Sequence, residues 1–230
     1  MSNNISLYIA AYNAEKTIEK SIKSILQQTL KPKEIIIIND CSTDKTLNLL
    51  KKFSQIKIIN NKKNYGLAKS RNIALKYSKY NLLASIDSDV VCKKNWLETL
   101  FNTMVKKKAD LIGGKLIDKY IKEPANHWRS YYLKQNWGDK QINNPQFIFG
   151  ANFLLNKKKI KSLNIKYNET FRTNGEDVNF SKVLKSKNCN LYYEPRALCY
   201  HYQFDDITSL SKRYWRYSYY GAGLKKLTLT

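Results

Sequence analysis

Two aspartates one residue apart, Asp87 and Asp89, end the apolar run in the segment LLASIDSDVVCKKNW. In an extended segment both carboxylates project to the same side, whereas Ser88 points away. Carboxylates held side by side repel each other unless a cation or a hydrogen-bond donor joins them, and their oxygens suit Mg²⁺ or Mn²⁺. The spacing therefore predicts a site for a metal ion and phosphate oxygens. The alternative is that the pair only caps a helix that begins near Lys94.

A third aspartate, Asp40, ends the run IIIIND. Ser42 or Thr43 can cap the helix expected next, with Asp44 in its first turn. Capping leaves Asp40 unexplained, and a carboxylate at the end of a strand can accept a hydrogen bond from the N–H group of a base. Asp40 is therefore a candidate for nucleotide binding.

The segment RTNGEDVNFS carries two adjacent acids. Thr173 and Glu176 have the spacing of a capping box, in which the glutamate turns back onto the helix terminus. Asp177 lies about 100° further round the helix, so this arrangement leaves it free to face a cleft as a general base.

Strands and helices that alternate along the chain must position these acids. Apolar runs and segments of helical period form four expected pairs, at 5–11 with 15–29, 34–40 with 43–53, 56–60 with 66–78, and 80–87 with 94–107. The run Ile35–Ile38 lacks alternation, as expected of a strand covered on both faces. Right-handed crossovers then predict a doubly wound α/β fold, whose ligands bind beyond the carboxyl ends of the strands.

The rest of the chain is less regular. After a strand at 109–117, the polar and aromatic stretch 118–144 is expected to be loop-rich or partly helical. The expected elements that follow are a strand and the start of a helix within 145–160, a helix within 171–188, two short strands within 190–203, and a helix from 207 to Gly221.

Five segments together resemble one known family. They are SLYIAAYNAEKTIEKSIKSIL, EIIIINDCSTDKT, NYGLAKSRNIAL, SIDSD and NGEDVNFS, and in this order and spacing they resemble the inverting family 2 glycosyltransferases of the GT-A fold. The resemblance is close over residues 5–115 and thinner to about residue 202. It implies a GT-A domain over 1–205, with a Rossmann-like, mostly parallel sheet flanked by helices. Its nucleotide-binding half is expected at about 1–117 and its acceptor-binding half at about 118–205, followed by a C-terminal aromatic and basic helical segment at 206–230 that docks to a membrane or an acceptor.

The resemblance also implies roles for individual residues. Asp177 matches the catalytic base, Asp89 the metal ligand, and Asp87 the acid beside the ribose and the metal. The implied nucleotide-sugar-binding residues are Ala11, Tyr12, Glu15, Asp40, Lys69, Arg71, Asp87 and Ser88, with Asp40 reading the uracil ring.

Three further assignments concern the metal and the acceptor. His201 lies where several family members place a third metal ligand, and the alternative is a histidine packed among aromatic residues. Glu176, Trp128 and Trp137 are assigned to acceptor binding. The two tryptophans would act as platforms for sugar rings, with packing in a core as the alternative.

The implied reaction moves a sugar from a nucleotide diphosphate sugar, a UDP-sugar by expectation, to a hydroxyl group of a glycan, a lipid-linked glycan or a glycolipid. The configuration at the anomeric carbon inverts, and Mn²⁺ or Mg²⁺ is the expected cofactor. A sugar-nucleotidyltransferase is a rival enzyme class, but such enzymes have a glycine-rich loop after the first strand, and AAYNAEKT contains no glycine.

The charge of the chain leaves several partners open. Lys and Arg number 41 against 18 Asp and Glu, which gives a formal net charge of +23. The excess is compatible with codon bias or with attraction to nucleic acid, an anionic membrane or a phosphorylated ligand. The segment KRYWRYSYYGAGLKK interleaves basic and aromatic residues, so a binding protein without transferase activity is a non-enzymatic rival, on nucleic acid or at a lipid surface. For the transferase we expect no nucleic acid but peripheral contact with anionic lipid.

The cysteines and the N-terminal sequence bear on location. Four cysteines without a CxxC pair predict reduced thiols in a cytosolic protein. The N-terminus lacks the basic start of a signal peptide, and no window reaches the ~18 apolar residues of a membrane span. The expected location is the cytoplasm, with the cytoplasmic face of a membrane as a possible working site.

Overall fold

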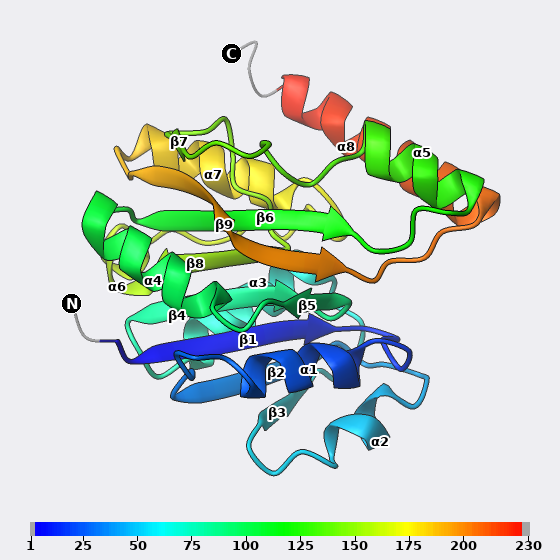
Figure 1. The fold of residues 1–230 in the computed structure, drawn as a ribbon, viewed down its shortest axis with the longest axis horizontal. Helices are drawn as coiled ribbons and strands as arrows, with labels where there is room; N and C mark the ends of the chain where they lie inside the picture. The colour runs from blue at the N-terminus through cyan, green and yellow to red at the C-terminus, as the bar shows by residue number, and fades with distance from the viewer. Residues whose placement is uncertain (1–2, 227–230) are drawn as a thin grey trace.

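The computed structural model describes residues 3–226, which fold around one mixed sheet of nine strands (Figure 1). The strands are β1 Ile5–Ala11, β2 Glu34–Asn39, β3 Lys57–Asn60, β4 Leu82–Asp87, β5 Val90–Cys92, β6 Leu111–Asp118, β7 Ile142–Asn143, β8 Asn152–Asn156 and β9 Leu191–His201. The helices are α1 Ile18–Leu26, α2 Thr46–Leu50, α3 Leu67–Tyr77, α4 Trp96–Lys107, α5 Pro124–Tyr132, α6 Lys157–Ser162, α7 Glu176–Ser186 and α8 Ile207–Lys226. The predicted α/β class is confirmed.

The first four strands form a parallel group within the sheet. The strand order is β3-β2-β1-β4-β8-β6-β9-β5, with β7 paired to β9, and β1 runs parallel to both β2 and β4. In this register Ala11 lies opposite Asn39 on one side, and Ala10 lies opposite Asp87 on the other. The carboxyl ends of these strands therefore share one edge, where the fold class places a ligand.

Helices cover both faces of the sheet, as the isoleucine run predicts. Ile35 and Ile37 are buried in the core on one face, with residues of α1 and α4, and Ile36 and Ile38 in the core on the other, with residues of α3 and α7. Figure 1 shows α1 and α4 in front of the sheet and α3 behind it. A strand buried on both faces needs no polar alternation, which explains the unbroken run.

The prediction of two short strands within 190–203 is wrong, because this segment forms the single strand β9. Its register with β6 shifts between Gly114, opposite Glu194, and Lys115, opposite Leu198. Pro195 within this bulge has no N–H group to donate, so the ladder is interrupted without ending the strand. Beyond the bulge, His201 lies opposite both Asp118 and Val90.

The predicted end of the C-terminal helix is also wrong, because α8 continues to Lys226 instead of ending at Gly221. A glycine inside a helix costs only about 1 kcal/mol relative to alanine, which does not suffice to end it. The helix packs beside α5, which is the helical part of the predicted insertion (Figure 1). Residues 227–230 of the predicted C-terminal segment lie outside the described residues. No helix within residues 3–226 is both long and apolar enough to cross a bilayer.

Candidate active site

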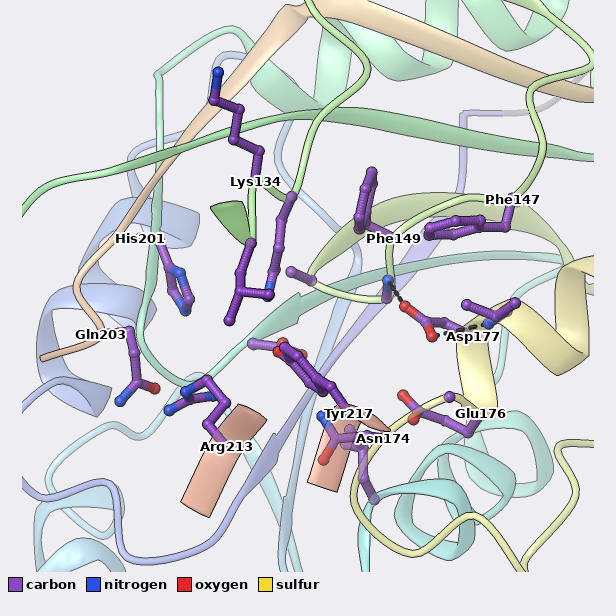
Figure 2. Close-up of a pocket in the computed structure, with 18 of the residues that line it drawn as sticks. Lys134, Phe147, Phe149, Asn174, Glu176, Asp177, His201, Gln203, Arg213 and Tyr217 are labelled. Carbon is purple, nitrogen blue, oxygen red and sulfur yellow. Dashed lines mark hydrogen bonds between the residues drawn. The ribbon is translucent and has the colours of Figure 1, made fainter. Parts of the chain in front are cut away.

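A cavity of about 580 Å³ lies at the carboxyl end of β4, between this strand, α7 and α8 (Figure 2). Six of the predicted site residues that line it are charged or titratable: Arg71, Asp87, Asp89, Glu176, Asp177 and His201. The structure therefore brings together acids that lie about 90 residues apart in the chain.

Asp87 and Asp89 both line this cavity, but the backbone between them is not extended as predicted. Strand β4 ends at Asp87, and Ser88 and Asp89 form a turn into β5, so the segment is not extended. Ser88 does not line the cavity, and its carbonyl accepts a hydrogen bond from the Ser21 hydroxyl. Capping does not account for the pair, because α4 begins after Asn95 without a side-chain cap. Burial raises the pKa of Asp87 to about 6, with Arg71 opposing the rise and Asp89 adding to it.

Asp89 forms a second group of charges with His201. The Nε2 atom of His201 lies 3.4 Å from Oδ2 of Asp89, and its Nδ1 atom lies 3.1 Å from Oδ1 of Asp118. Burial opposes protonation of this ring, but the Asp89 and Asp118 carboxylates raise the pKa of His201 to about 9. His201 therefore carries a positive charge between two carboxylates at neutral pH.

This group has the donor set of a divalent cation site that a ligand would complete. Asp87 and Asp89 offer carboxylate oxygens, and His201 offers an imidazole nitrogen that a metal would take in place of its proton. Asp118 would orient the ring from the other nitrogen, as carboxylates behind metal-bound histidines do. Within residues 3–226 no three His, Cys, Asp or Glu side chains are arranged to hold a metal by themselves. The remaining ligands would have to be water and phosphate oxygens.

Asp177 lies in the first turn of α7 and is held by main-chain donors. Its Oδ2 accepts a hydrogen bond from the N–H of Gly150 (2.8 Å), and its Oδ1 accepts one from the N–H of Val178 (2.8 Å) (Figure 2). A Cβ atom at position 150 would lie 2.5 Å from the Arg71 guanidinium and 3.3 Å from Cβ of Asp177. Glycine is therefore required where the chain passes between these two side chains.

Glu176 is not part of a capping box, and this prediction is wrong. Helix α7 begins after Gly175 without a side-chain cap, and Glu176 is 3% exposed. Its Oε1 accepts a hydrogen bond from Nε of Arg71 at 3.2 Å. Burial raises the pKa of Glu176 to about 8, Asp177 adds to the rise, and Arg71 opposes it. The assignment of Glu176 to the acceptor stays a prediction, although the carboxyl is engaged inside the protein.

The pKa of Glu176 predicts a pH dependence of stability. The folded-state value near 8 lies above the ordinary 4.5, so the stabilisation that Glu176 contributes is complete below pH 4.5 and is lost as the pH rises toward 8. Glu176→Gln should therefore flatten the fall in the free energy of unfolding between these pH values, measured by urea denaturation. Asp87 retains part of the slope because its pKa is raised as well. The exposed Glu123→Gln is the control, and an unchanged slope in Glu176→Gln would contradict the assignment.

Arg71 is buried behind the acids of the cavity and pairs with two of them, Asp87 and Glu176. The side chain is 1% exposed, and besides Glu176 its guanidinium contacts Asp87 at 3.5 Å and donates to the Tyr8 hydroxyl at 3.0 Å. The sequence assigns it to the nucleotide. In the structure its N–H groups point to protein acceptors, so it positions the acids.

The other predicted nucleotide residues lie along the same sheet edge but outside the cavity. Ala11 ends β1, and its carbonyl accepts the N–H of Asp40. Asp40 is 4% exposed and accepts hydrogen bonds from Asn61 and from the N–H groups of Tyr65 and Gly66. Contact with a uracil ring would have to share these oxygens, and this role stays a prediction.

The loop after β1 is bonded to the loop after β2. Glu15 donates its N–H to Asp44 and accepts from the N–H of Lys45, and Asn13 accepts from the N–H of Thr43. These bonds hold residues 43–45 outside the helix, so α2 is shorter than predicted and neither Ser42 nor Thr43 caps it.

Two predicted nucleotide residues lie at the surface. Tyr12 is half exposed on the loop after β1, next to Ala11. Lys69 forms an ion pair with Glu169 at 2.9 Å and does not line the cavity. The structure therefore does not bring Lys69 together with the acids.

The two tryptophans assigned to the acceptor are placed differently. Trp137 lines the cavity, donates its Nε1–H to the carbonyl of Phe147, and packs against Phe147 and Phe149. Trp128 lies on α5, outside the cavity, and packs against Tyr132 and Tyr214.

Helix α8 contributes to the cavity, which the sequence did not indicate. Arg213 and Tyr217, four residues apart on one face of this helix, line it (Figure 2). Arg213 pairs with the buried Asp205 at 3.1 Å, and Asp205 pairs with Arg129 at 2.6 Å. Arg129 also contacts Asp118 at 2.9 Å, so buried charges connect α8 to His201. The four-residue spacing was visible in the sequence, but nothing local indicated that this face is turned inward.

Comparisons with known proteins identify the family to which the chain is similar. A family model described as "Glycosyl transferase family 2" matches residues 6–164. Glycosyltransferase GlyG of Streptococcus pneumoniae is 27% identical over 194 residues, which are 76% of this chain and 62% of GlyG. The UDP-Glc:alpha-D-GlcNAc-diphosphoundecaprenol beta-1,3-glucosyltransferase WfgD of Escherichia coli is 37% identical over 112 residues, which are 48% of this chain and 44% of WfgD.

Solved structures share the fold. The crystal structure of S. aureus TarS in complex with UDP-GlcNAc superposes with a TM-score of 0.72 at 20% identity, over 90% of this chain and 60% of the TarS chain. In all three comparisons the chain spans less than two thirds of the length of the other protein.

Proposed function

The chain belongs to glycosyltransferase family 2, and we propose that it transfers a sugar from a UDP-sugar to a hydroxyl group of a lipid-linked glycan or glycolipid, with inversion at the anomeric carbon. The observation that carries the proposal is the meeting of Asp177 with Asp87 and Asp89 in one cavity at the carboxyl edge of the sheet. A base and a diphosphate site are the two parts that such a transfer requires. By its name WfgD uses UDP-Glc and a diphosphoundecaprenol-linked acceptor, which supports the proposed substrate classes.

Asp177 is the proposed base. Each of its oxygens accepts one main-chain N–H, which orients the carboxylate and leaves other lone pairs for a proton. The acceptor hydroxyl would lose its proton to Asp177 while its oxygen bonds to the anomeric carbon. The bond from this carbon to the diphosphate would break on the opposite face, which inverts the configuration.

Asp87, Asp89 and His201 are the proposed holders of Mn²⁺ or Mg²⁺. When bound, such an ion neutralises the charge that develops on a departing diphosphate. Arg71 keeps Asp87 in position from the buried side, and Asp118 does the same for His201.

Metal dependence can be tested by turnover of a UDP-sugar with Mn²⁺ or with a chelator. We expect the chelator to reduce turnover by about 10²-fold or more, and Asp89→Asn to reduce it similarly at saturating Mn²⁺, because an uncompensated diphosphate is a poor leaving group. Asp139→Asn, at a side chain that is 88% exposed, is the matched control. Equal turnover with metal and with chelator would reject metal dependence and leave the transferase assignment standing.

The proposed working site is the cytoplasmic face of a membrane. A lipid-linked acceptor resides in a bilayer, and four cysteines without a CxxC pair favour a reducing compartment.

A donor screen tests the proposed reaction as a whole. The chain would be incubated with a panel of UDP-sugars and lipid extract, released UDP would be measured, and the anomeric configuration of the product determined by NMR. We expect release from one UDP-sugar to rise when acceptor lipid is added, and a product of inverted configuration. A product of retained configuration would reject Asp177 as the base, and no release from any UDP-sugar would reject the donor class.

A further inference from the structure

Exposed apolar side chains gather at one corner of the molecule. Among the described residues, fourteen large hydrophobic side chains are exposed, and eleven of them lie within residues 117–132 and 204–219. The other three are Tyr12, Tyr77 and Val105. We call the exposed side chains of 117–132 and 204–219 the aromatic corner. It covers α5, α8 and the segments that lead into them, which lie together in Figure 1.

Ring contacts join the two helices of the aromatic corner. Trp128 of α5 lies 4.8 Å from Tyr132 and 5.8 Å from Tyr214 of α8, measured between ring centroids. Trp215 stacks on Tyr219 at 5.4 Å. An apolar groove of about 460 Å³ between the helices is lined by Trp128, Leu210, Tyr214 and Trp215. The exposed rings of α5 and α8 are therefore joined across the two helices and are not isolated side chains.

Helix α8 is divided between this surface and the cavity. Arg213 and Tyr217 line the cavity, whereas Ile207, Tyr214 and Trp215 are between 54% and 75% exposed on another side of the helix. A helix with one face engaged in the protein and an aromatic face in solvent needs a second partner for that face.

The charges around the aromatic corner identify the partner. Lys119, Lys122 and Lys212 are exposed in the same segments, and Lys134 is exposed two residues after the first of them. The acids Asp118 and Asp205 do not offset them at the surface, because both pair with buried Arg129. Exposed Glu123 and Asp206 leave the local excess positive, in a chain with a formal net charge of +23.

Trp and Tyr interspersed with Lys are typical of surfaces that enter the headgroup region of a bilayer. Lysine is depleted in the cores of protein interfaces, which argues against a second protein as the partner. The position of the corner also fits a lipid surface, because Tyr132 of α5 belongs to it and lines the cavity.

We propose that the aromatic corner docks on an anionic lipid bilayer, with the exposed sides of α5 and α8 in the headgroup layer and the cavity opening beside them. The inference rests on the proposed function, because a lipid-linked acceptor would then present its sugar at the cavity mouth while its lipid stays in the bilayer. In this proposal α5, from the middle of the chain, contacts the bilayer together with the C-terminal helix α8.

Flotation of the whole chain with vesicles tests the docking surface. Vesicles of phosphatidylglycerol and phosphatidylcholine are compared with vesicles of phosphatidylcholine alone, and binding is expected only to the first. Tyr131→Ser combined with Trp215→Ser should weaken partition at least about tenfold, because both aromatic rings leave the headgroup layer. Tyr77→Ser combined with Val105→Ser is the control, because it removes two exposed apolar side chains elsewhere on the molecule. Partition should be unchanged in this variant.

Reversing the charge of exposed lysines tests the electrostatic part of vesicle binding independently. Lys122→Glu combined with Lys212→Glu should reduce binding to the anionic vesicles at least about tenfold, and added salt should weaken binding of the unmodified chain. Lys51→Glu combined with Lys106→Glu makes the same charge change at exposed sites directly after α2 and on α4, and it should have a much smaller effect.

Four outcomes would overturn the proposal: equal binding to neutral vesicles, equal losses in the surface and control variants, no vesicle binding at all, or a dimer in light scattering that the Tyr131→Ser and Trp215→Ser changes dissociate. A second measurement separates the docking surface from the proposed function. Hydrolysis of the UDP-sugar without acceptor is measured on the same variants. It should be unchanged, because neither Tyr131 nor Trp215 lines the cavity. Hydrolysis without vesicle binding would reject the docking surface alone. Vesicle binding without turnover of any UDP-sugar would reject the proposed function alone.

Discussion

Replacing Asp177 by asparagine is expected to reduce sugar transfer by about 10²- to 10⁴-fold, the range that a positioned general base contributes. The amide cannot take the proton of the acceptor hydroxyl. It also presents one NH₂ group where the carboxylate accepts the N–H of Gly150 or Val178, so one hydrogen bond is lost. That loss costs about 1 kcal/mol, which leaves the fold intact.

The measurement that isolates this role is a pair of assays on one preparation. Transfer is followed by release of UDP, and UDP affinity by calorimetry, where the variant should match the unmodified chain because Asp177 does not contact the diphosphate in the proposed mechanism. Asp110→Asn, at a carboxylate that accepts the N–H of Asn190 far from the cavity, is the control for the chemical change. Parallel losses of turnover and UDP affinity in Asp177→Asn would remove Asp177 from the role of base.

The second large effect is expected from Arg71→Met. Methionine fills much of the space but donates no hydrogen bond, so Glu176, Asp87 and Tyr8 lose their shared partner. Removing one partner of a buried ion pair typically costs 3–5 kcal/mol, and we expect a loss of about that size in the free energy of unfolding, measured in urea. Transfer should fall as well, because Asp87 loses the side chain that holds it.

The loss should also depend on pH. Without Arg71 the pKa of Glu176 rises further above its unfolded value, so the penalty should be larger at pH 8 than at pH 5, where the carboxyl is protonated in the folded chain. Arg71→Met combined with Glu176→Gln should recover part of the stability at pH 8, since no buried carboxylate then remains at position 176. Arg172→Met, at an exposed arginine nearby, is the control. Equal stability of Arg71→Met and the unmodified chain would show that Arg71 is not the centre of the site.

The structure brings the candidate acids into one cavity and gives them neighbours that the sequence did not indicate. Asp87, Asp89 and Asp177 are marked by local patterns, either the end of an apolar run or the start of a helical one, and all three line the cavity. The spacing of Thr173 and Glu176 predicted a capping box that the structure does not contain, because a buried arginine 105 residues away in the chain donates to the Glu176 carboxyl instead. Local spacing contains no information about such a partner.

The second half of the chain shows the same limit. Pro195 reads locally as a break between two strands, whereas pairing with β6 on one side of a bulge and again on the other keeps β9 continuous. Arg213 and Tyr217 lie in a segment whose composition suggests a surface helix, and their face turns inward only because Asp205 and Arg129 hold α8 from the protein side.

By itself the sequence determined the strand and helix order of the first four units apart from the short strand β5, the burial of β2 on both faces and the place of the acids at strand and helix ends. Each of these depends on periodicity within a few residues. Only the tertiary structure decided which charges meet. It paired Arg71 with Glu176 and Asp87, set His201 between Asp89 and Asp118, and turned one side of α8 to the cavity and another to solvent. These contacts join segments far apart in the chain, and burial makes each of them strong enough to override a local preference.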